Sequence, residues 1–258
     1  MRLTILGSGS SVPHPERSSS AYWLETSGGK ILLDCGPSAA QRMAEEGLEW
    51  PELDAIWISH FHLDHVGGLS PFLFSTRYAP QTIDREKPLR IFGPSGLRAL
   101  IDAFNDANDY RLLDQPFTVE IVEVGPLEQF EIFEGVVAGT FDTPHTTESR
   151  AIRIADGDLS FVYTSDTGFS KPLAGFARNA DLLLMECSFV KDKPVEKHLE
   201  LAEAVFMARY SKAKRTVLTH FYPEWDEVIF ESVVERALRG YEIVEARDGL
   251  SIEVSGKQ

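Results

Sequence analysis

The sequence predicts a layered α/β protein, with strands and helices interspersed along a single domain that covers residues 1–258. Short apolar runs rich in Ile, Val, Phe and Tyr are ended by Gly, Pro or Asp, which is typical of strands. These runs are dense in the first part of the chain, as in a sheet protein with helices outside. We expect strands at Leu3–Leu6, Lys30–Leu33, Ala55–Ser59, Leu89–Phe92, Phe117–Val124, Val136–Phe141, Ala151–Ile154, Leu159–Thr164, Leu182–Met185 and Thr216–Thr219.

Helical patterns occur between some of these runs. No Gly/Ser-rich linker, low-complexity run or internal repeat divides the chain, so one domain is the simplest interpretation. One helical segment carries an apolar stripe at helical spacing, formed by Leu199, Ala202, Phe206 and Tyr210. We expect helices at Pro37–Glu46, Gly96–Phe104, Leu199–Tyr210 and Asp226–Arg239.

Composition and charge narrow the class of protein. The chain is 43% hydrophobic and 25% charged, which is ordinary globular usage. Its formal net charge of −15 repels phosphate backbones at long range, so we expect nucleic acid to be unlikely as a main partner. We find no signal peptide and no apolar run near the roughly 20 residues that span a bilayer, so we expect a cytoplasmic protein with no membrane partner. Cys35 and Cys187 are too few for a disulfide framework, as expected in a reducing compartment.

A histidine-rich motif, H-x-H-x-D-H, directly follows the predicted strand Ala55–Ser59 and precedes Gly67-Gly68. It therefore lies on a strand-to-helix turn, a place that presents side chains into a cleft. Two His at i and i+2 can converge on one metal ion, while the Asp at i+4 and the His at i+5 point toward a second ion about 3.5–4 Å away. The candidate ligands of this motif are His60, His62, Asp64 and His65.

Three further residues of metal-ligand type, His145, Asp166 and His220, each follow the carboxyl end of a predicted strand. Five imidazoles and two carboxylates suit Zn²⁺, and Mn²⁺ or Fe could also bind because carboxylates accept harder ions. We expect two divalent metal ions. The first would take His60, His62 and His145, the second Asp64, His65 and His220, and Asp166 would bridge them.

The order of these residues resembles the metallo-β-lactamase superfamily, and this resemblance implies a four-layer αββα sandwich with the metals at one sheet edge. Several segments are similar to the ribonuclease Z branch of that superfamily. They are residues 6–13, 17–20, 32–36 and 93–96, together with residues 181–188, which resemble the H-E-A-T segment, and residues 197–199, which resemble the catalytic histidine ahead of a helix.

Two departures from the ribonuclease Z pattern bear on function. Met185 stands where the H-E-A-T segment carries histidine, although Glu186 keeps its place. Ribonuclease Z enzymes that process tRNA carry a Gly/Pro-rich arm between the third metal histidine and the bridging aspartate. Here only residues 146–165 separate His145 from Asp166, and two predicted strands fill that stretch, which leaves no room for an arm.

His198 and Glu186 are candidates for a proton-transfer pair, with the imidazole near the leaving oxygen and the carboxylate fixing its tautomer. The alternative is a histidine that makes a structural hydrogen bond near a helix start.

Nearby polar residues have simpler interpretations. Lys191, Lys193 and Lys197 could bind substrate phosphate, but a solvated loop is the simpler interpretation. Asp34 would orient a metal ligand or cap the following helix. We assign no role to His14.

The sequence thus predicts a dinuclear metal-dependent hydrolase, specifically a phosphodiesterase that cleaves a small phosphodiester by attack of a metal-bound hydroxide. Its catalytic residues would be Asp64, His198 and Glu186. The alternatives are a ribonuclease Z-type endonuclease that processes tRNA 3′ ends, and a hydrolase of a carbonyl substrate such as a lactone, thioester or β-lactam. A metal-binding scaffold without catalysis is the non-enzyme alternative. A homodimer is left open.

Overall fold

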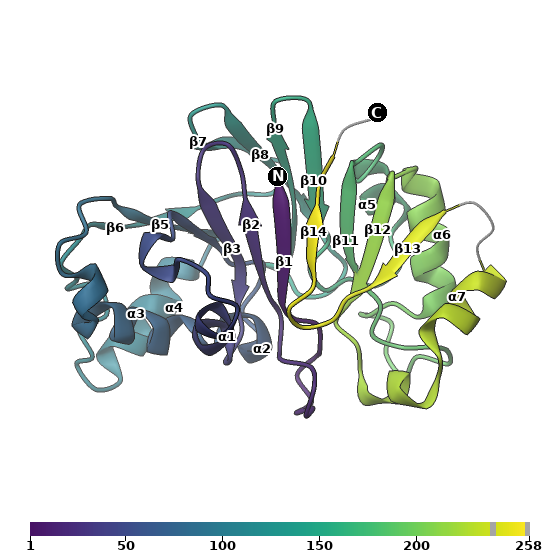
Figure 1. The fold of residues 1–258 in the computed structure, drawn as a ribbon, viewed down its shortest axis with the longest axis horizontal. Coiled ribbons are helices and arrows are strands. Elements are labelled where there is room, and N and C mark those ends of the chain that lie inside the picture. Colours follow the sequence, from purple (N-terminus) through teal and green to yellow (C-terminus); the bar gives the residue numbers. More distant parts are fainter. Residues whose placement is uncertain (238–240, 256–258) are drawn as a thin grey trace.

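Two seven-stranded sheets lie face to face, with helices on the outside, in the computed structural model, which describes residues 1–237 and 241–255 (Figure 1). This is the αββα sandwich of the metallo-β-lactamase fold, as the resemblance implied. The first sheet has the order β14-β1-β2-β3-β4-β5-β6, and the second has the order β13-β12-β11-β10-β9-β8-β7.

The bounds of the strands are as follows. The first sheet contains β1 (Arg2–Gly7), β2 (Ala21–Glu25), β3 (Lys30–Cys35), β4 (Ala55–Trp57), β5 (Leu89–Gly93), β6 (Val119–Glu123) and β14 (Ser251–Glu253). The second contains β7 (Gln129–Phe133), β8 (Val136–Asp142), β9 (Arg150–Asp156), β10 (Leu159–Tyr163), β11 (Leu182–Glu186), β12 (Arg215–Thr219) and β13 (Glu242–Glu245).

Helices cover the outer faces of both sheets (Figure 1). Beside the first sheet lie α1 (Ala39–Glu45), α2 (Leu63–Val66), α3 (Leu69–Tyr78) and α4 (Leu97–Asp106), and beside the second lie α5 (Lys171–Phe176), α6 (Leu201–Ser211) and α7 (Phe230–Ala237). Short 3₁₀ turns occur at Trp50–Glu52, Pro80–Thr82 and Pro223–Glu227. None of the helices in the described residues is long and apolar enough to cross a membrane.

The apolar runs of the first sheet divide between two cores. In β3, Ile31 and Leu33 belong to the core between the sheets, whereas Leu32 belongs to the core under α1, α3 and α4. Successive side chains of a strand point to opposite faces, so a strand buried on both faces needs an unbroken apolar run. This explains why the run Lys30–Leu33 lacks polar alternation.

Parallel pairing fixes where the strands end. Strands β3 to β6 run parallel in the first sheet, and β10 to β13 run parallel in the second. Neighbouring parallel strands bring their carboxyl ends to the same edge, where open α/β sheets place their sites. The polar residues that follow β4, β10 and β12 therefore gather at one end of the sandwich.

The strands expected from the sequence are all present, but four further strands, β2, β7, β13 and β14, and three helices, α2, α3 and α5, lie outside the expected ranges. The helix expected at Asp226–Arg239 begins only at Phe230, because a 3₁₀ turn at Pro223–Glu227 comes first. Residues 238–239 of that expectation lie outside the described residues.

The expected apolar stripe is not the buried face of α6. Phe206 and Tyr210 are 44% and 41% exposed, and the helix packs instead through small and aliphatic side chains such as Ala204, Val205 and Ala208. Small residues let a helix approach the sheet closely, so they occupy the inner face although the aromatic residues carry more apolar surface.

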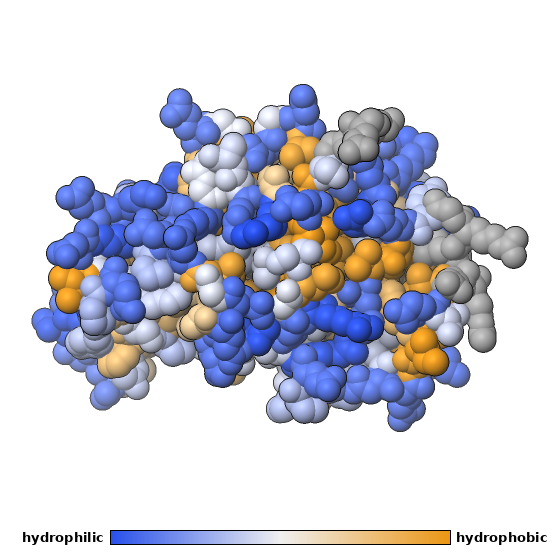
Figure 2. All heavy atoms as spheres, in the orientation of Figure 1, coloured by the Kyte–Doolittle hydropathy of each residue, from blue (hydrophilic) through white to orange (hydrophobic). Residues whose placement is uncertain are grey.

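The surface in the view of Figure 2 is mainly hydrophilic, with apolar side chains gathered near the middle and toward α7. A groove beside β13 contributes there, lined among others by Phe230, Val234, Ile243 and Leu250.

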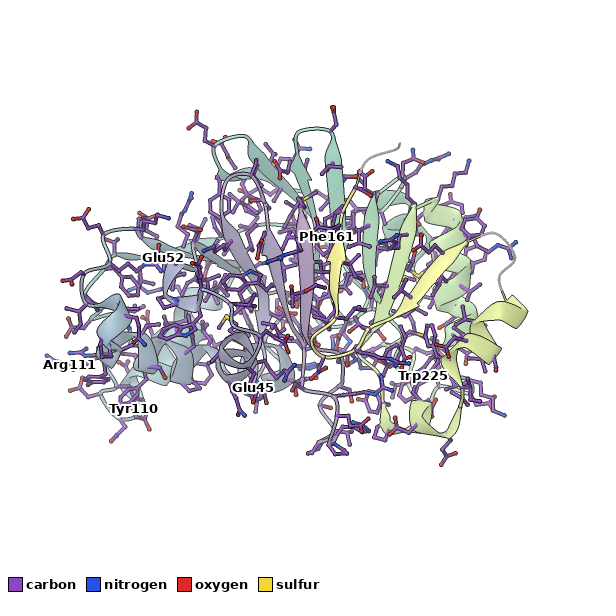
Figure 3. All side chains as sticks on the ribbon, viewed as in Figure 1. Glu45, Glu52, Tyr110, Arg111, Phe161 and Trp225 are labelled. Atoms are coloured by element: carbon purple, nitrogen blue, oxygen red, sulfur yellow. The ribbon has the colours of Figure 1, made fainter. Side chains whose placement is uncertain are left out.

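Phe161 tests the core between the sheets, because its side chain is fully buried. It lies in the middle of the molecule, far from Tyr110 and Arg111 at one end (Figure 3). Phe161→Ala should lower the free energy of unfolding by about 3–5 kcal/mol, because it removes a large side chain from a packed interior. The matched control, Phe74→Ala, removes a ring that is 43% exposed and should cost about 1 kcal/mol or less. If urea unfolding showed equal losses of unfolding free energy in the two variants, this packing would be contradicted.

Candidate metal centre

The candidate ligands lie on turns at the carboxyl ends of strands. The H-x-H-x-D-H motif follows β4 and runs into α2, His145 follows β8, Asp166 follows β10 and His220 follows β12. At this edge His220 has a φ of 61° and Ser165, next to Asp166, a φ of 58°. Left-handed backbone of this kind costs an ordinary residue of order 1–3 kcal/mol and clusters at functional sites. It turns the chain sharply, so that the side chains face inward.

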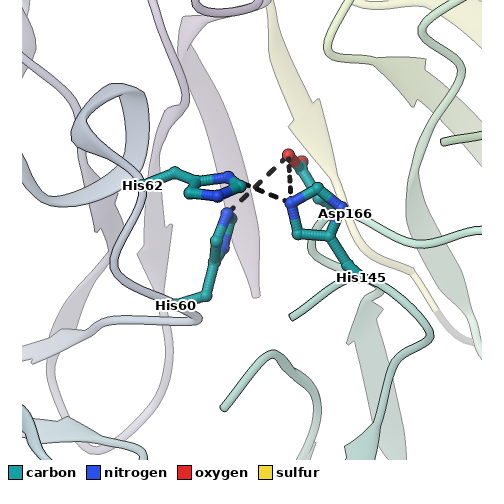
Figure 4. Close-up of side chains that lie close together, drawn as sticks. All are labelled: His60, His62, His145 and Asp166. Carbon is teal, nitrogen blue, oxygen red and sulfur yellow. Dashed lines mark hydrogen bonds and ion pairs between the residues drawn. The ribbon is translucent and has the colours of Figure 1, made fainter. Parts of the chain in front are cut away.

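One group consists of His60, His62, His145 and Asp166, whose nitrogen and oxygen atoms lie within 4.8 Å of one another (Figure 4). His145 Nε2 lies 3.0 Å from His62 Nδ1 and 3.7 Å from Asp166 Oδ2. His60 Nε2 lies 3.8 Å from the same carboxylate oxygen. These four side chains could hold one cation.

A second group consists of Asp64, His65, Asp166 and His220, within the same 4.8 Å limit. His220 Nε2 lies 3.3 Å from Asp64 Oδ2 and 3.4 Å from Asp166 Oδ2. His65 Nε2 lies 3.3 Å from Asp166 Oδ1. The structure thus brings the residues together in the two groups that the sequence analysis proposed, with Asp166 shared, while their role as metal ligands stays a prediction.

Three atoms in these groups test whether a cation fits. His60 Nε2, His65 Nε2 and Asp166 Oδ1 are buried and have no hydrogen-bond partner among the described residues. Buried polar atoms are nearly always paired, because an unpaired one keeps its full desolvation cost. Imidazole nitrogens and a carboxylate oxygen that converge on one point are satisfied together by a divalent cation. The donor set therefore fits two metal ions.

The outward nitrogens of the imidazoles are held by acceptors. His65 Nδ1 donates to Asp34 Oδ2 at 2.7 Å, and His145 Nδ1 donates to the Lys197 carbonyl at 2.9 Å. Each bond turns Nδ1 toward an acceptor and Nε2 inward, the orientation found around metal-ligating histidines. Asp34 is itself fixed by the Tyr163 hydroxyl at 2.7 Å. Of the two roles expected for Asp34, the structure supports the orientation of a candidate ligand.

The charges of the groups suit cation binding. Burial, then the charge of His65, lowers the pKa of His60 well below its usual range, which keeps that ring neutral. Burial opposes ionisation of Asp166, but the charges of His220 and His65 hold the pKa of its carboxyl well below the usual range. Neutral imidazoles and ionised carboxylates are the forms that bind metals.

The pKa of His65 indicates which sign of charge the site stabilises. Burial lowers it, yet the Asp166 and Asp34 carboxylates outweigh burial and raise the pKa of His65 well above its usual range. The site between these carboxylates therefore stabilises positive charge, which a divalent cation would also supply.

His198 and Glu186 form the pair expected from the sequence. His198 Nδ1 donates to Glu186 Oε1 at 2.9 Å. Glu186 also accepts from the Thr167 amide at 2.6 Å and the Leu199 amide at 3.0 Å, so its carboxylate is fixed. Burial acts against protonation of His198, but the hydrogen bond and charge of Glu186 raise its pKa to about 9. Glu186 therefore favours the protonated form of His198.

Glu186, His198 and His220 also lie close enough together to be considered as a metal group. His220, however, turns its Nδ1 toward the Ser188 hydroxyl at 3.0 Å and its Nε2 toward Asp64. It therefore belongs to the second group. Glu186 is occupied by hydrogen-bond donors, which suits a carboxylate that positions His198.

A cleft of about 450 Å³ opens onto both groups. Its wall includes residues that the sequence analysis did not single out as site residues. Ser11 and Ser19 lie in segments noted there for their ribonuclease Z resemblance, and Tyr222 lies two residues after His220. None of the described residues that line the cleft is Lys or Arg, so the lysines before His198 lie outside its lining. The lining residues are Ser11, Ser19, Pro37, His62, Leu63, Asp64, Asp166, His198, His220 and Tyr222.

The fold and the two His/Asp groups define a protein of the metallo-β-lactamase superfamily in its ribonuclease Z-like branch. The resemblance seen in the sequence is therefore confirmed. Within this class, the family profile described as "Anti-Pycsar protein Apyc1" matches residues 1–238, and the chain belongs to that family.

Similar proteins cover nearly the whole chain. The ribonuclease Z of Methanosarcina acetivorans is 25% identical over 309 aligned positions, which include 98% of each protein. The Bacillus subtilis protein named "Probable metallo-hydrolase YhfI" is 26% identical over 223 positions, 85% of this chain and 86% of its own. The crystal structure of human tRNase Z, short form, superposes with a TM-score of 0.79 at 24% identity, over 99% of this chain and 100% of that one. Relatives named for RNA processing weigh against the expectation that nucleic acid is an unlikely partner.

Metal content tests the two groups. Protein purified without chelator should contain about two equivalents of metal by elemental analysis, and a chelator should lower its melting temperature, because the ions bind only the folded state. Asp64→Ala should lose metal, whereas the matched control Glu45→Ala, at an exposed carboxylate of α1 (Figure 3), should keep both ions. A content near zero after reconstitution with Zn²⁺, Mn²⁺ or Fe would contradict the assignment.

Proposed function

We propose that this protein is a metal-dependent hydrolase that cleaves a small phosphodiester. Two divalent cations, Zn²⁺ in the first instance and Mn²⁺ or Fe as alternatives, would be held by His60, His62, Asp64, His65, His145, Asp166 and His220. The observation that carries the proposal is the hydrogen-bonded pair of His198 and Glu186, with His198 in the wall of the same cleft.

Each side chain has a part in this reaction. Divalent cations held by the two groups supply Lewis acidity, which offsets charge on the phosphoryl group and activates water. His198 donates a proton to the departing oxygen, and Glu186 fixes the imidazole so that Nε2 is free for that transfer. Asp64 acts at the reaction centre as a ligand. Ser11 and Ser19 also line this cleft, and the Ser19 hydroxyl donates to the Ser10 carbonyl at 3.2 Å.

A general acid at His198 favours a phosphodiester substrate over a lactone, thioester or β-lactam. An alkoxide that leaves phosphorus is a poor leaving group and needs protonation, which His198 supplies. Hydrolysis of a lactone, thioester or β-lactam by the same cations is the alternative within enzymes. A metal-binding scaffold without catalysis would need no buried acid pair beside the cleft.

A small substrate is favoured over tRNA for two reasons. Between His145 and Asp166 the chain forms β9, β10 and the tight turn at Gly157, and no arm. The alignment with the archaeal ribonuclease Z extends over 309 positions although this chain has 258 residues, so that enzyme carries segments absent here. A partner in a homodimer would bring the same sequence and therefore no arm. Cleavage of tRNA 3′ ends remains the second candidate function, because relatives of this chain are named ribonuclease Z.

The role of His198 is tested by its leaving-group dependence. His198→Ala should keep both ions and lose about 10²–10⁴-fold in rate on an alkoxide-leaving substrate, the usual contribution of general acid catalysis. The loss should be smaller for bis-p-nitrophenyl phosphate, because p-nitrophenolate needs little protonation. His14→Ala is the matched control, since His14 pairs with Asp226 away from the cleft and should leave the rate unchanged. Full activity in His198→Ala would make His198 structural.

Substrate size is tested by comparing kcat/KM for a precursor tRNA with kcat/KM for a small cyclic or linear phosphodiester, in one buffer at stated salt. We expect the small phosphodiester to be preferred, because phosphate contacts from Lys and Arg supply most non-specific affinity for RNA, and neither occurs among the described residues that line the cleft. Efficient, site-specific 3′ cleavage of the tRNA would overturn this expectation. A lactone in the same panel tests the carbonyl alternative.

A further inference from the structure

Lys193 lies in the loop between β11 and α6, and its side chain is folded inward although its neighbours are in solvent. Its side chain is 8% exposed, whereas those of Lys191, Asp192 and Glu196 are 82%, 89% and 91% exposed. An ammonium removed from water is costly unless it is paired. Its position in an exposed loop therefore requires specific partners.

Three acceptors surround the ammonium of Lys193. Its Nζ lies 3.2 Å from the His198 carbonyl oxygen, 2.9 Å from Glu203 Oε1 and 3.1 Å from Glu196 Oε2. An ammonium has three donors, so these contacts use its full capacity. Burial opposes the charge, but the hydrogen bonds of Glu203 and Glu196 raise the pKa of Lys193, which keeps it charged.

Two of these contacts connect the loop to α6. Glu203 belongs to the first turn of that helix, where it also accepts from the Glu200 amide at 3.2 Å in a capping box. Lys193 therefore joins the fixed start of α6 to the main chain of His198. Among the described residues, no backbone amide donates a hydrogen bond to the His198 carbonyl.

His198 is thus held through both its ring and its main chain. Glu186 fixes its ring through Nδ1 and, through the Leu199 amide, the chain just after it. Lys193 fixes the carbonyl of His198 itself. Lys193 does not line the cleft, so it does not touch a substrate there.

We propose that Lys193 is a positioning residue for His198, which sets where the imidazole meets the leaving oxygen. This role rests on the proposed function of His198 as an acid. A displacement of about 1 Å can cost about 10²-fold in rate, so a lost anchor on the main chain is enough to impair proton transfer.

The test uses Lys193→Met, which keeps the length of the side chain and removes the ammonium, and the matched control Lys191→Met in the same loop. For each metal-loaded protein, kcat is measured on a 3′,5′-cyclic nucleotide, which has an alkoxide leaving group, and on bis-p-nitrophenyl phosphate. The ratio of the two values from one preparation does not depend on the folded fraction. Lys193→Met should lower this ratio about tenfold, with metal content and KM little changed. Lys191→Met should leave it unchanged, and Lys193→Arg should restore part of it.

The double variant separates positioning from a general structural effect. In the His198→Ala background, Lys193→Met should lower the ratio no further, because both changes act through one proton transfer. An unchanged ratio in Lys193→Met, or an additive loss in the double variant, would overturn the proposal for Lys193 alone. If His198→Ala with Lys193 intact leaves the ratio unchanged, the assignment of His198 fails, and the role of Lys193 fails with it.

Discussion

The carboxylate of Asp166 is the group on which the rest of the site depends. It is buried, and its oxygens lie 3.8 Å and 3.3 Å from His60 and His65, which follow a strand of the first sheet, and 3.7 Å and 3.4 Å from His145 and His220, which follow strands of the second. A buried charge without a counter-charge is strongly destabilising. Positive charge must therefore gather around this carboxylate, and residues from both sheets must meet there, which fixes the ends of the two sheets relative to each other.

The acid pair is separate from the metal groups yet connected to them. The Ser188 hydroxyl lies 2.8 Å from Glu186 Oε2, 3.2 Å from His198 Nδ1 and 3.0 Å from His220 Nδ1. A single hydroxyl thus links the carboxylate, the proposed acid and a candidate ligand. Because hydrogen-bonded groups of this kind hold one another in place, the distance between the proton donor and the reaction centre is set by the protein before any substrate binds.

Sequence reasoning could identify the site because its residues carry a local signal. The H-x-H-x-D-H spacing and the polar residues after strands predict which side chains gather at this sheet edge and in which two groups, while their role as metal ligands stays a prediction. Other features lack such a signal. The edge strand β14 is three residues long, and α3 contains Pro71 and several aromatic residues of modest helix propensity, so packing decides both. The apolar stripe correctly predicted the helix α6, because its spacing fits a helix, but the side chains that pack closely against the sheet are mostly smaller ones.

The distribution of charged side chains indicates which part of the cleft would attract an anionic substrate. The chain carries a net charge of −15, and neither Lys nor Arg occurs among the described residues that line the cleft. Within this cleft, an anionic substrate would therefore be attracted by the proposed cations and by His198, close to the proposed reaction centre. A long RNA needs contacts far from the cut, and proteins that share a fold can differ in segments that provide them. Under the function proposed above, the fold shared with ribonuclease Z enzymes would supply the reaction centre, and the absence of an arm between His145 and Asp166 favours substrates small enough to be held at that centre alone.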